Sequence, residues 1–184
     1  MPLGRGTPGA CPRVDASSVP RLRHICALVV VLALAAVPVA LAAVPRSTHT
    51  SPEQRVLQLI NKQRARHGLK PLRSDGALIT VARGHSRDMV HRNYFSHRSK
   101  GGSDPSDRIA AAGGRGAIGE DLAWGTGSYA TPSAIVKLWM NSPPHRRVLL
   151  AKDLRYVGIG RATGRFQGYS GAAVFTADFS GRVR

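Results

Sequence analysis

An unbroken run of apolar residues near the N-terminus limits which part of this chain can fold as a globular domain. Every residue from Ile25 to Val44 is apolar, and Arg21 and Arg23 precede this run. A basic segment followed by an apolar core and an Ala-x-Ala sequence, here residues 40–42, is typical of a secretion signal. A run of about 20 apolar residues is also long enough to span a bilayer, so a retained membrane anchor is the alternative.

Both interpretations divide the chain into the same three parts. Residues 1–43 form the signal peptide or N-terminal membrane anchor, residues 44–50 form a polar, proline-containing linker, and residues 51–184 form one domain. The basic flank on the N-terminal side of the apolar run predicts that the domain lies outside the cytoplasm. We therefore expect a secreted, extracellular protein, or one anchored to the outer face of the cytoplasmic membrane.

The cysteine and charge counts narrow the classes of function. Cys11 and Cys26 both precede the expected domain, so that domain has no disulfide framework, thiolate metal site or thiol nucleophile. The chain has a formal net charge of +17, and residues 1–43 account for four arginines and one aspartate, which leaves +14 for the remainder. This charge is typical either of a solvated surface or of attraction to a lipid or an anionic cell-envelope component. No nucleic acid is expected as a partner, because the basic residues form no runs and no aromatic residues interleave with them.

Helix signals dominate the first part of the domain, and strand signals dominate its end. Apolar residues at helical spacing predict helices over 51–67, 75–91 and 131–141, with Ser51 and Thr131 as the caps of the first and the third. Shorter helical segments are expected around Ile109, with Ser106 or Asp107 as the cap, and over 148–150.

Strands are expected over 118–125, 156–160 and 169–179. The last two strands should pair antiparallel across a Gly/Arg-rich turn, because their connection is too short for a helical crossover. Helices that come first and strands that come late indicate an α+β fold, with helices packed on an antiparallel sheet.

Three large side chains on these helices and strands are expected to be part of the hydrophobic core. His85 lies on the apolar face of the second helix, where a histidine with satisfied hydrogen bonds is more common than a ligand. Trp124 and Trp139 are expected to be core anchors rather than platforms for a ligand.

Five segments, taken in order, resemble the bacterial CAP family, which comprises the cysteine-rich secretory proteins, antigen 5 and pathogenesis-related 1 proteins and is also called the SCP-like family. They are Leu59–Leu72 (LINKQRARHGLKPL), Ala82–Met89 (ARGHSRDM), Tyr94–His97 (YFSH), Gly119–Ala123 (GEDLA) and Trp139–Arg146 (WMNSPPHR). The resemblance extends over about residues 53–179. It implies an α-β-α sandwich with a central, mainly antiparallel sheet.

The resemblance also implies a cleft that holds two histidines and two acidic residues. It places His97 and His145 at the histidine positions and Glu120 at the first acidic position. The second acidic position, three residues after the tryptophan of its helix, is Ser142 in this chain, and Asp121 stands where the family usually has asparagine. The candidate catalytic residues and the candidate metal ligands are therefore the same three: His97, Glu120 and His145.

Three roles are possible for His97, Glu120 and His145. Two imidazoles and one carboxylate fit a zinc ion with a free position for water, which the metal would activate near neutral pH. Without metal, Glu120 is a candidate general base and a histidine the acid. In a purely structural network, Glu120 would satisfy both imidazoles.

Two functions follow from these possibilities, and the sequence leaves open whether the protein is an enzyme. The first is a binding module for a lipid, a cell-envelope component or another extracellular ligand, which the missing second acid favours. The alternative is an extracellular, zinc-dependent hydrolase. Neither the ligand nor the oligomeric state follows from the sequence.

Overall fold

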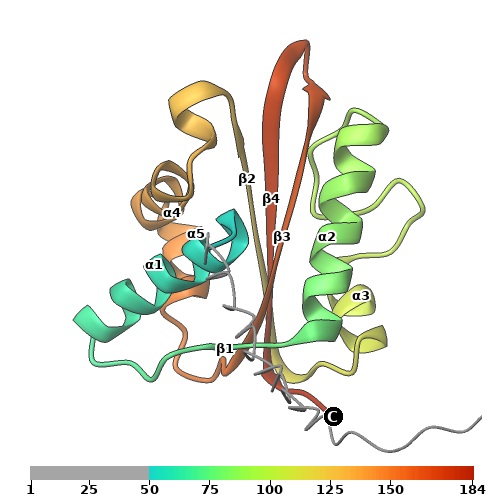
Figure 1. The fold of residues 1–184 in the computed structure, drawn as a ribbon. Helices are drawn as coiled ribbons and strands as arrows, with labels where there is room; N and C mark the ends of the chain where they lie inside the picture. Colours follow the sequence, from blue (N-terminus) through green and yellow to red (C-terminus); the bar gives the residue numbers. More distant parts are fainter. Residues whose placement is uncertain (1–49) are drawn as a thin grey trace, which may run out of the picture. The chain divides into compact units, whose positions relative to one another are not determined.

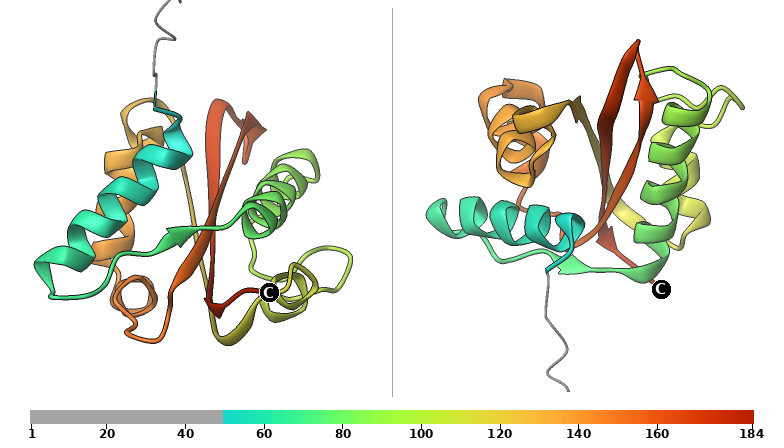
Figure 2. Two further views of the ribbon diagram at one scale, coloured as in Figure 1. Left: turned by 60° about the horizontal axis from the view of Figure 1, so that its bottom comes forward. Right: turned by 45° about the horizontal axis from the view of Figure 1, so that its top comes forward.

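The computed structural model describes residues 50–184, which fold into three layers (Figure 1). The helices are α1 (Pro52–Arg66), α2 (Gly76–His91), α3 (Pro105–Ala111), the 3-10 helix η1 (Gly127–Ala130), α4 (Pro132–Asn141) and α5 (Pro143–Leu149). The strands are β1 (Arg73–Ser74), β2 (Arg115–Gly125), β3 (Tyr156–Phe166) and β4 (Tyr169–Arg182). In Figures 1 and 2, α1, α4 and α5 cover one face of the sheet, and α2 and α3 cover the other. This arrangement confirms the expected α+β fold and its α-β-α layering.

The expectations for residues 1–49, which are the signal peptide or anchor and most of the linker, lie outside the described residues. Within residues 50–184, no helix combines the length and the apolar character that crossing a membrane requires.

The sheet has the strand order β1-β3-β4-β2, so β2 is an edge strand. The β2–β4 and β3–β4 pairs are antiparallel, as expected, whereas the short β1 pairs parallel with β3 and was not anticipated. The turn between β3 and β4 is also shorter than expected. Residues 161–164 continue the ladder against 172–175, because a Gly/Arg-rich segment can still donate and accept every backbone hydrogen bond of a strand.

Capping side chains fix where the helices begin. Ser51 caps α1 in a reciprocal capping box with Gln54, which confirms the expected start of this helix. The cap of α3 is Asp104, so the expected caps Ser106 and Asp107 were wrong. Asp104 precedes a proline at the first helical position, where a missing N–H costs nothing, and this places the cap two residues earlier.

The segment after α4 is a helix rather than a stop followed by a turn. Pro143 and Pro144 occupy the first turn of α5, which tolerates proline because its N–H groups have no intrahelical partner. Ser142 ends α4 and caps α5, so the two helices share one junction residue. This junction carries His145 to the edge of the sheet.

The core is split by the sheet into two clusters of unequal size. The larger lies under α1, α4 and α5 and contains Trp139, which is fully buried and donates its indole N–H to the Leu122 carbonyl at 3.0 Å. The smaller lies under α2. Trp139 is thus the expected core anchor, whereas Trp124 is only half-buried and packs edge-on against Phe166, with 5.3 Å between ring centroids.

Helix α2 lies directly on the sheet because β3 presents glycines to it. A Cβ atom at Gly158 would lie 2.1 Å from the backbone of Leu78, and one at Gly160 would lie 2.2 Å from the backbone of Ala82. Any larger residue at these positions would push the helix away. The close packing gives α2 a fixed position, from which His85 reaches the candidate site.

Candidate functional site

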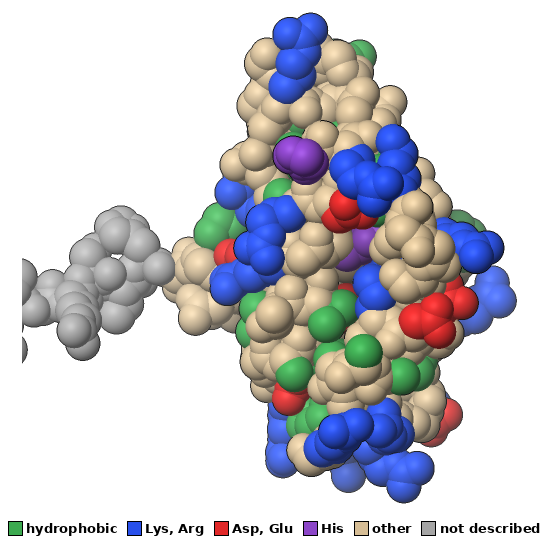
Figure 3. Space-filling model, turned by 90° about the vertical axis from the view of Figure 1, so that its right-hand side faces the viewer, with side chains coloured by type: hydrophobic (Ala, Val, Ile, Leu, Met, Phe, Trp, Pro, Cys, Tyr) green, Lys and Arg blue, Asp and Glu red, His purple; other side chains and the backbone are tan. Residues whose placement is uncertain are grey.

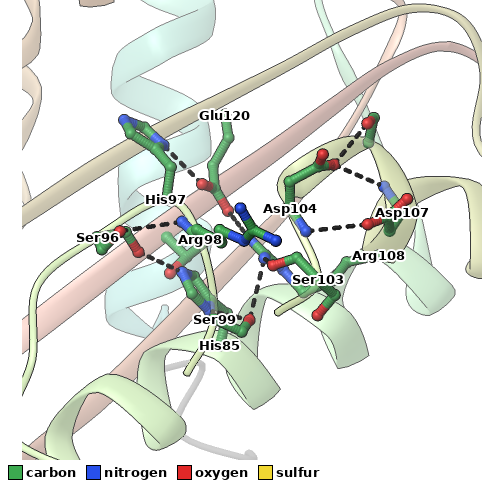
Figure 4. Close-up of polar contacts among 12 residues, drawn as sticks. His85, Ser96, His97, Arg98, Ser99, Ser103, Asp104, Asp107, Arg108 and Glu120 are labelled. Atoms are coloured by element: carbon green, nitrogen blue, oxygen red, sulfur yellow. Dashed lines mark hydrogen bonds and ion pairs between the residues drawn. The ribbon is translucent and has the colours of Figure 1, made fainter. Parts of the chain in front are cut away.

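Glu120 is the centre of the polar network on the α2–α3 side of the sheet. It lies on the edge strand β2, and its side chain is only 1% exposed. Its Oε1 accepts a hydrogen bond from His97 Nδ1 at 2.7 Å, and its Oε2 accepts one from the Arg108 guanidinium at 2.6 Å (Figure 4). The structure therefore brings together two of the expected residues, His97 and Glu120, and adds an arginine.

Side chains from α2 and α3 hold the loop between these helices against the site. Arg108 donates to the Ser99 hydroxyl and to the Ser103 carbonyl, both at 3.1 Å. From α2, His85 makes a 3.0 Å hydrogen bond through Nε2 to the Ser96 carbonyl. His85 is 2% exposed, which confirms the expected core histidine with a satisfied hydrogen bond. The loop, which carries His97, is thus anchored from two helices.

The charges around Glu120 keep it ionised. Burial raises the pKa of Glu120, but the hydrogen bond from His97 and the positive charge of Arg108 outweigh burial, so the pKa lies below its usual value. Burial lowers the pKa of His85, which keeps that ring neutral at physiological pH. The network is therefore an anionic carboxylate held between an arginine whose side chain is 12% exposed and a histidine whose side chain is 53% exposed.

His145 lies on α5, which covers the opposite face of the sheet from α2 and α3 (Figure 1). Its Nδ1 is buried and has no hydrogen-bond partner among the described residues. Burial, and secondarily repulsion from the charged form of His97, lower the pKa of His145, so the two rings are close enough for their charges to interact. Ser142, at the second acidic position, caps α5 without a side-chain hydrogen bond.

An open groove with a volume of about 640 Å³ runs along this second half of the site. It is lined by Ser128, Tyr129, Ala134, Lys137, Leu138, Asn141, Ser142 and His145. Tyr129 and Leu138 are 74% and 47% exposed, although both are large and apolar. The groove therefore combines an apolar wall from η1 and α4 with a polar end at His145.

The residues as arranged do not fit a zinc ion. Both oxygens of Glu120 already accept short hydrogen bonds, and Ser142 offers no second carboxylate. Within residues 50–184, no three side chains of His, Cys, Asp or Glu converge as a metal site. Zinc binding by His97, His145 and Glu120 stays a prediction.

Two residues of the network, Arg108 and Asp178, were not anticipated from the sequence. Arg108 gave no signal, because nothing in its spacing predicts that it reaches β2. Asp178 lies directly opposite Glu120 in the β2–β4 register, and neither of its oxygens has a hydrogen-bond partner among the described residues. Burial and then the charge of Glu120 raise its pKa well above the usual value. An acid within an otherwise apolar strand was the available signal for Asp178.

Asp121 faces the opposite side of the sheet from Glu120, since successive residues of a strand alternate. It pairs in register with Ala177, which belongs to the larger apolar cluster, and it is fully buried. Neither carboxylate oxygen has a described hydrogen-bond partner. Burial, together with the nearby charge of Glu120, raises the pKa of Asp121 to about 8.

Sequence comparison finds relatives that share this domain but are longer. The chain is 38% identical over 109 residues to an uncharacterized protein, YkwD, of Bacillus subtilis, covering 59% of this chain and 41% of the relative. It is 37% identical over 120 residues to an uncharacterized membrane protein, YlbC, of the same organism, covering 62% of this chain and 33% of the relative. The chain thus spans less than half the length of these two curated relatives.

Comparison with solved structures gives the same fold. An extracellular SCP-domain protein of Bacillus anthracis superimposes with a TM-score of 0.59 at 31% identity, over 70% of this chain and 40% of the other. An outer surface protein of Borrelia burgdorferi also gives a TM-score of 0.59, at 22% identity, over 70% and 90% of the two chains. The family model of the cysteine-rich secretory protein (CAP) family matches residues 57–179, the span that contains His97, Glu120 and His145. The chain therefore belongs to the CAP family.

Proposed function

We propose that this protein is a secreted or surface-held binding module whose groove takes a lipid or another cell-envelope component with an apolar part. The observation that carries the proposal is the open groove beside His145, with Tyr129 and Leu138 exposed along it. Exposed apolar side chains that gather along a concave surface are typical of ligand sites. His145, together with Asn141 and Ser142, gives the groove a polar end.

The state of Glu120 favours binding over hydrolysis. A general base needs a carboxylate oxygen that is free to accept a proton, and its pKa should lie near the working pH. Both oxygens of Glu120 are instead held by His97 and Arg108, and its pKa is lowered. In this role the His97–Glu120 pair holds the loop that carries His97 against β2.

The neighbours and the charge support a place at the cell surface. The solved relatives include an extracellular and an outer surface protein, and one curated relative is described as a membrane protein. Figure 3 shows Lys and Arg side chains distributed over the α2–α3 side of the domain. The formal charge of +17 suits attraction to anionic lipids or envelope polymers.

The test compares two double variants of the full chain, purified in detergent. Leu138→Asn with Tyr129→Ser removes the apolar wall of the groove. Ile118→Asn with Tyr169→Ser is the matched control, because those residues are also large, apolar and exposed but lie outside the groove. Binding of a fluorescent acyl lipid should weaken roughly tenfold in the first variant and stay unchanged in the second.

Equal binding by both variants would overturn the proposal. The same samples should also be assayed for hydrolysis of acyl esters. Turnover that disappears in His97→Ala and Glu120→Gln would replace the binding module with an enzyme.

A further inference from the structure

A second concave site lies at the opposite edge of the sheet from the cleft. A hollow of about 320 Å³ is lined by Lys70, Pro71, Arg73, Arg155 and Tyr156. It lies at β1 and the start of β3, whereas the cleft is built on β2, the other edge strand. Figure 1 shows β1 crossing the foot of the sheet, away from η1 and α4. Lys70, Arg73 and Arg155 are all exposed.

A fourth cation, Arg64, is buried beneath this hollow. Arg64 extends from α1 and is 1% exposed. Its guanidinium donates hydrogen bonds only to backbone carbonyls, which are those of Lys70 (2.9 Å), Leu149 (2.7 Å), Ala151 (3.0 Å) and Leu154 (3.4 Å). These bonds hold together the two chain segments that line the hollow.

The charge of Arg64 is not neutralised by the described part of the chain. Carbonyl groups satisfy its N–H groups but carry no net charge, and no carboxylate in residues 50–184 forms an ion pair with it. Burial, and then repulsion from Arg155, lower the pKa of Arg64, which still stays protonated at physiological pH. A buried, uncompensated charge is costly, so a counter-ion nearby would stabilise the fold.

The acidic residues nearest in sequence do not fill this need. Asp75 uses its carboxylate to cap α2, where it accepts from the backbone of Ala77 and Leu78 at 3.0 Å. Asp153 is exposed and does not line the hollow. Neither of them forms an ion pair with a cation in the described range. The hollow is therefore concave, cationic and without a counter-charge from its own surroundings.

We propose that this hollow binds a phosphate group. Guanidinium groups match phosphate oxygens through paired hydrogen bonds, and a lysine adds a mobile point charge. Arg155 donates to the Leu154 carbonyl at 2.9 Å, which holds its guanidinium at the rim. Tyr156, which is half-buried, adds an aromatic side chain to the lining of the hollow. The site is independent of the groove beside His145.

The test measures phosphate binding by the full chain, purified in detergent. One variant replaces Lys70, Arg73 and Arg155 by glutamine. The matched control replaces Lys62, Arg87 and Arg165 by glutamine, which removes the same charge from exposed positions outside the hollow. The probes are glycerol 3-phosphate in solution, and mixed micelles that contain either phosphatidylglycerol or phosphatidylcholine. Binding is followed by the NMR signals of the arginine Nε–H groups.

Binding of glycerol 3-phosphate that weakens roughly tenfold in the hollow variant, but not in the control, supports a site for a soluble or polymeric phosphate ester. Binding confined to phosphatidylglycerol micelles, with the same loss, supports a lipid headgroup as the source. Equal losses in both variants would show non-specific attraction by net charge and overturn the proposal, as would no binding of any probe.

The groove variant with Leu138→Asn and Tyr129→Ser separates this proposal from the proposed function. It should lose lipid binding through the groove but keep binding of glycerol 3-phosphate. If the groove variant loses both, the hollow is not an independent site and this inference fails.

Discussion

The two halves of the cleft differ in how their polar groups are satisfied. On the α2–α3 side, Glu120 is buried and both of its oxygens accept hydrogen bonds from His97 and Arg108. On the α4–α5 side, His145 has a buried nitrogen without a described partner, and Ser142 stands in place of an acid. The first half is preorganised by the fold, whereas the second keeps unmet hydrogen-bonding capacity. In the proposed function, this contrast favours the second half as the part of the cleft that contacts a ligand.

The largest expected loss of stability comes from substituting Glu120, in the half of the cleft where the carboxylate oxygens are hydrogen-bonded. Glu120→Leu leaves the Arg108 guanidinium buried without its carboxylate. Removing one partner of a buried ion pair typically costs about 3–5 kcal/mol, so we expect the free energy of unfolding to fall by about that much. Chemical denaturation at neutral pH measures the change.

A double variant tests whether the cost arises from the unpaired arginine. Glu120→Leu combined with Arg108→Met removes both charges and should recover most of the lost stability, since a buried pair can be replaced by apolar residues at little cost. If the double variant is as unstable as Glu120→Leu alone, the pair is not what holds this half together.

A smaller effect is expected at Asp121, the unpaired acid on the other face of the sheet. The unfolded carboxyl ionises near a pKa of about 3.9, whereas in the folded protein its pKa is about 8. Between these values the unfolded state binds fewer protons, so the free energy of unfolding falls as the pH rises from about 4 to about 8. The Asp121→Asn variant has no carboxyl group to ionise at this position. Its free energy of unfolding should therefore exceed that of the wild type by roughly 2–4 kcal/mol at pH 8.

Unfolding curves at several pH values distinguish this cause from a general effect on packing. The difference between Asp121→Asn and the wild type should be small at pH 4 and should grow steadily toward pH 8. A difference that does not change with pH would mean that the carboxyl of Asp121 is not neutral in the folded protein at pH 7.

Local patterns predicted most of the fold. The helices α1, α2 and α4 follow from apolar residues at helical spacing, and two of them also from the expected caps Ser51 and Thr131. The strand segments that local patterns did not predict depend on pairing with residues far away in the sequence. Strand β1 is two residues long and exists only because β3 lies beside it. The ends of β3 and β4 extend beyond their apolar residues because each strand completes the other's hydrogen bonds.

The candidate site was predicted less completely than the fold. His97 and Glu120 were expected together, because the family resemblance identified both, and the structure joins them at 2.7 Å. Arg108 and Asp178 reach Glu120 through packing of α3 and through strand register, neither of which a single sequence displays. The resemblance also grouped His145 with the other two. In the structure, Glu120 is hydrogen-bonded to His97 but not to His145.

The smallest expected effect is a change in the pKa of His145 when a carboxylate is placed at position 142, where the family has its second acid. Ser142→Glu places a carboxylate three residues before His145, a spacing at which side chains on a helix are neighbours. A carboxylate there should raise the pKa of His145 by about 1 unit, which an NMR titration of the ring detects. The control is Ser133→Glu, which adds the same charge at the first turn of α4 but outside the groove.

The same variant tests why no metal site converges within residues 50–184. With a second carboxylate beside His145, zinc affinity should rise roughly tenfold over the wild type, because carboxylate oxygen is a favourable zinc ligand. A raised pKa of His145 without tighter zinc binding would show that the hydrogen bonds to His97 and Arg108 keep Glu120 from turning toward a metal. In that case Ser142 is not the reason, and the satisfied half of the cleft limits its chemistry.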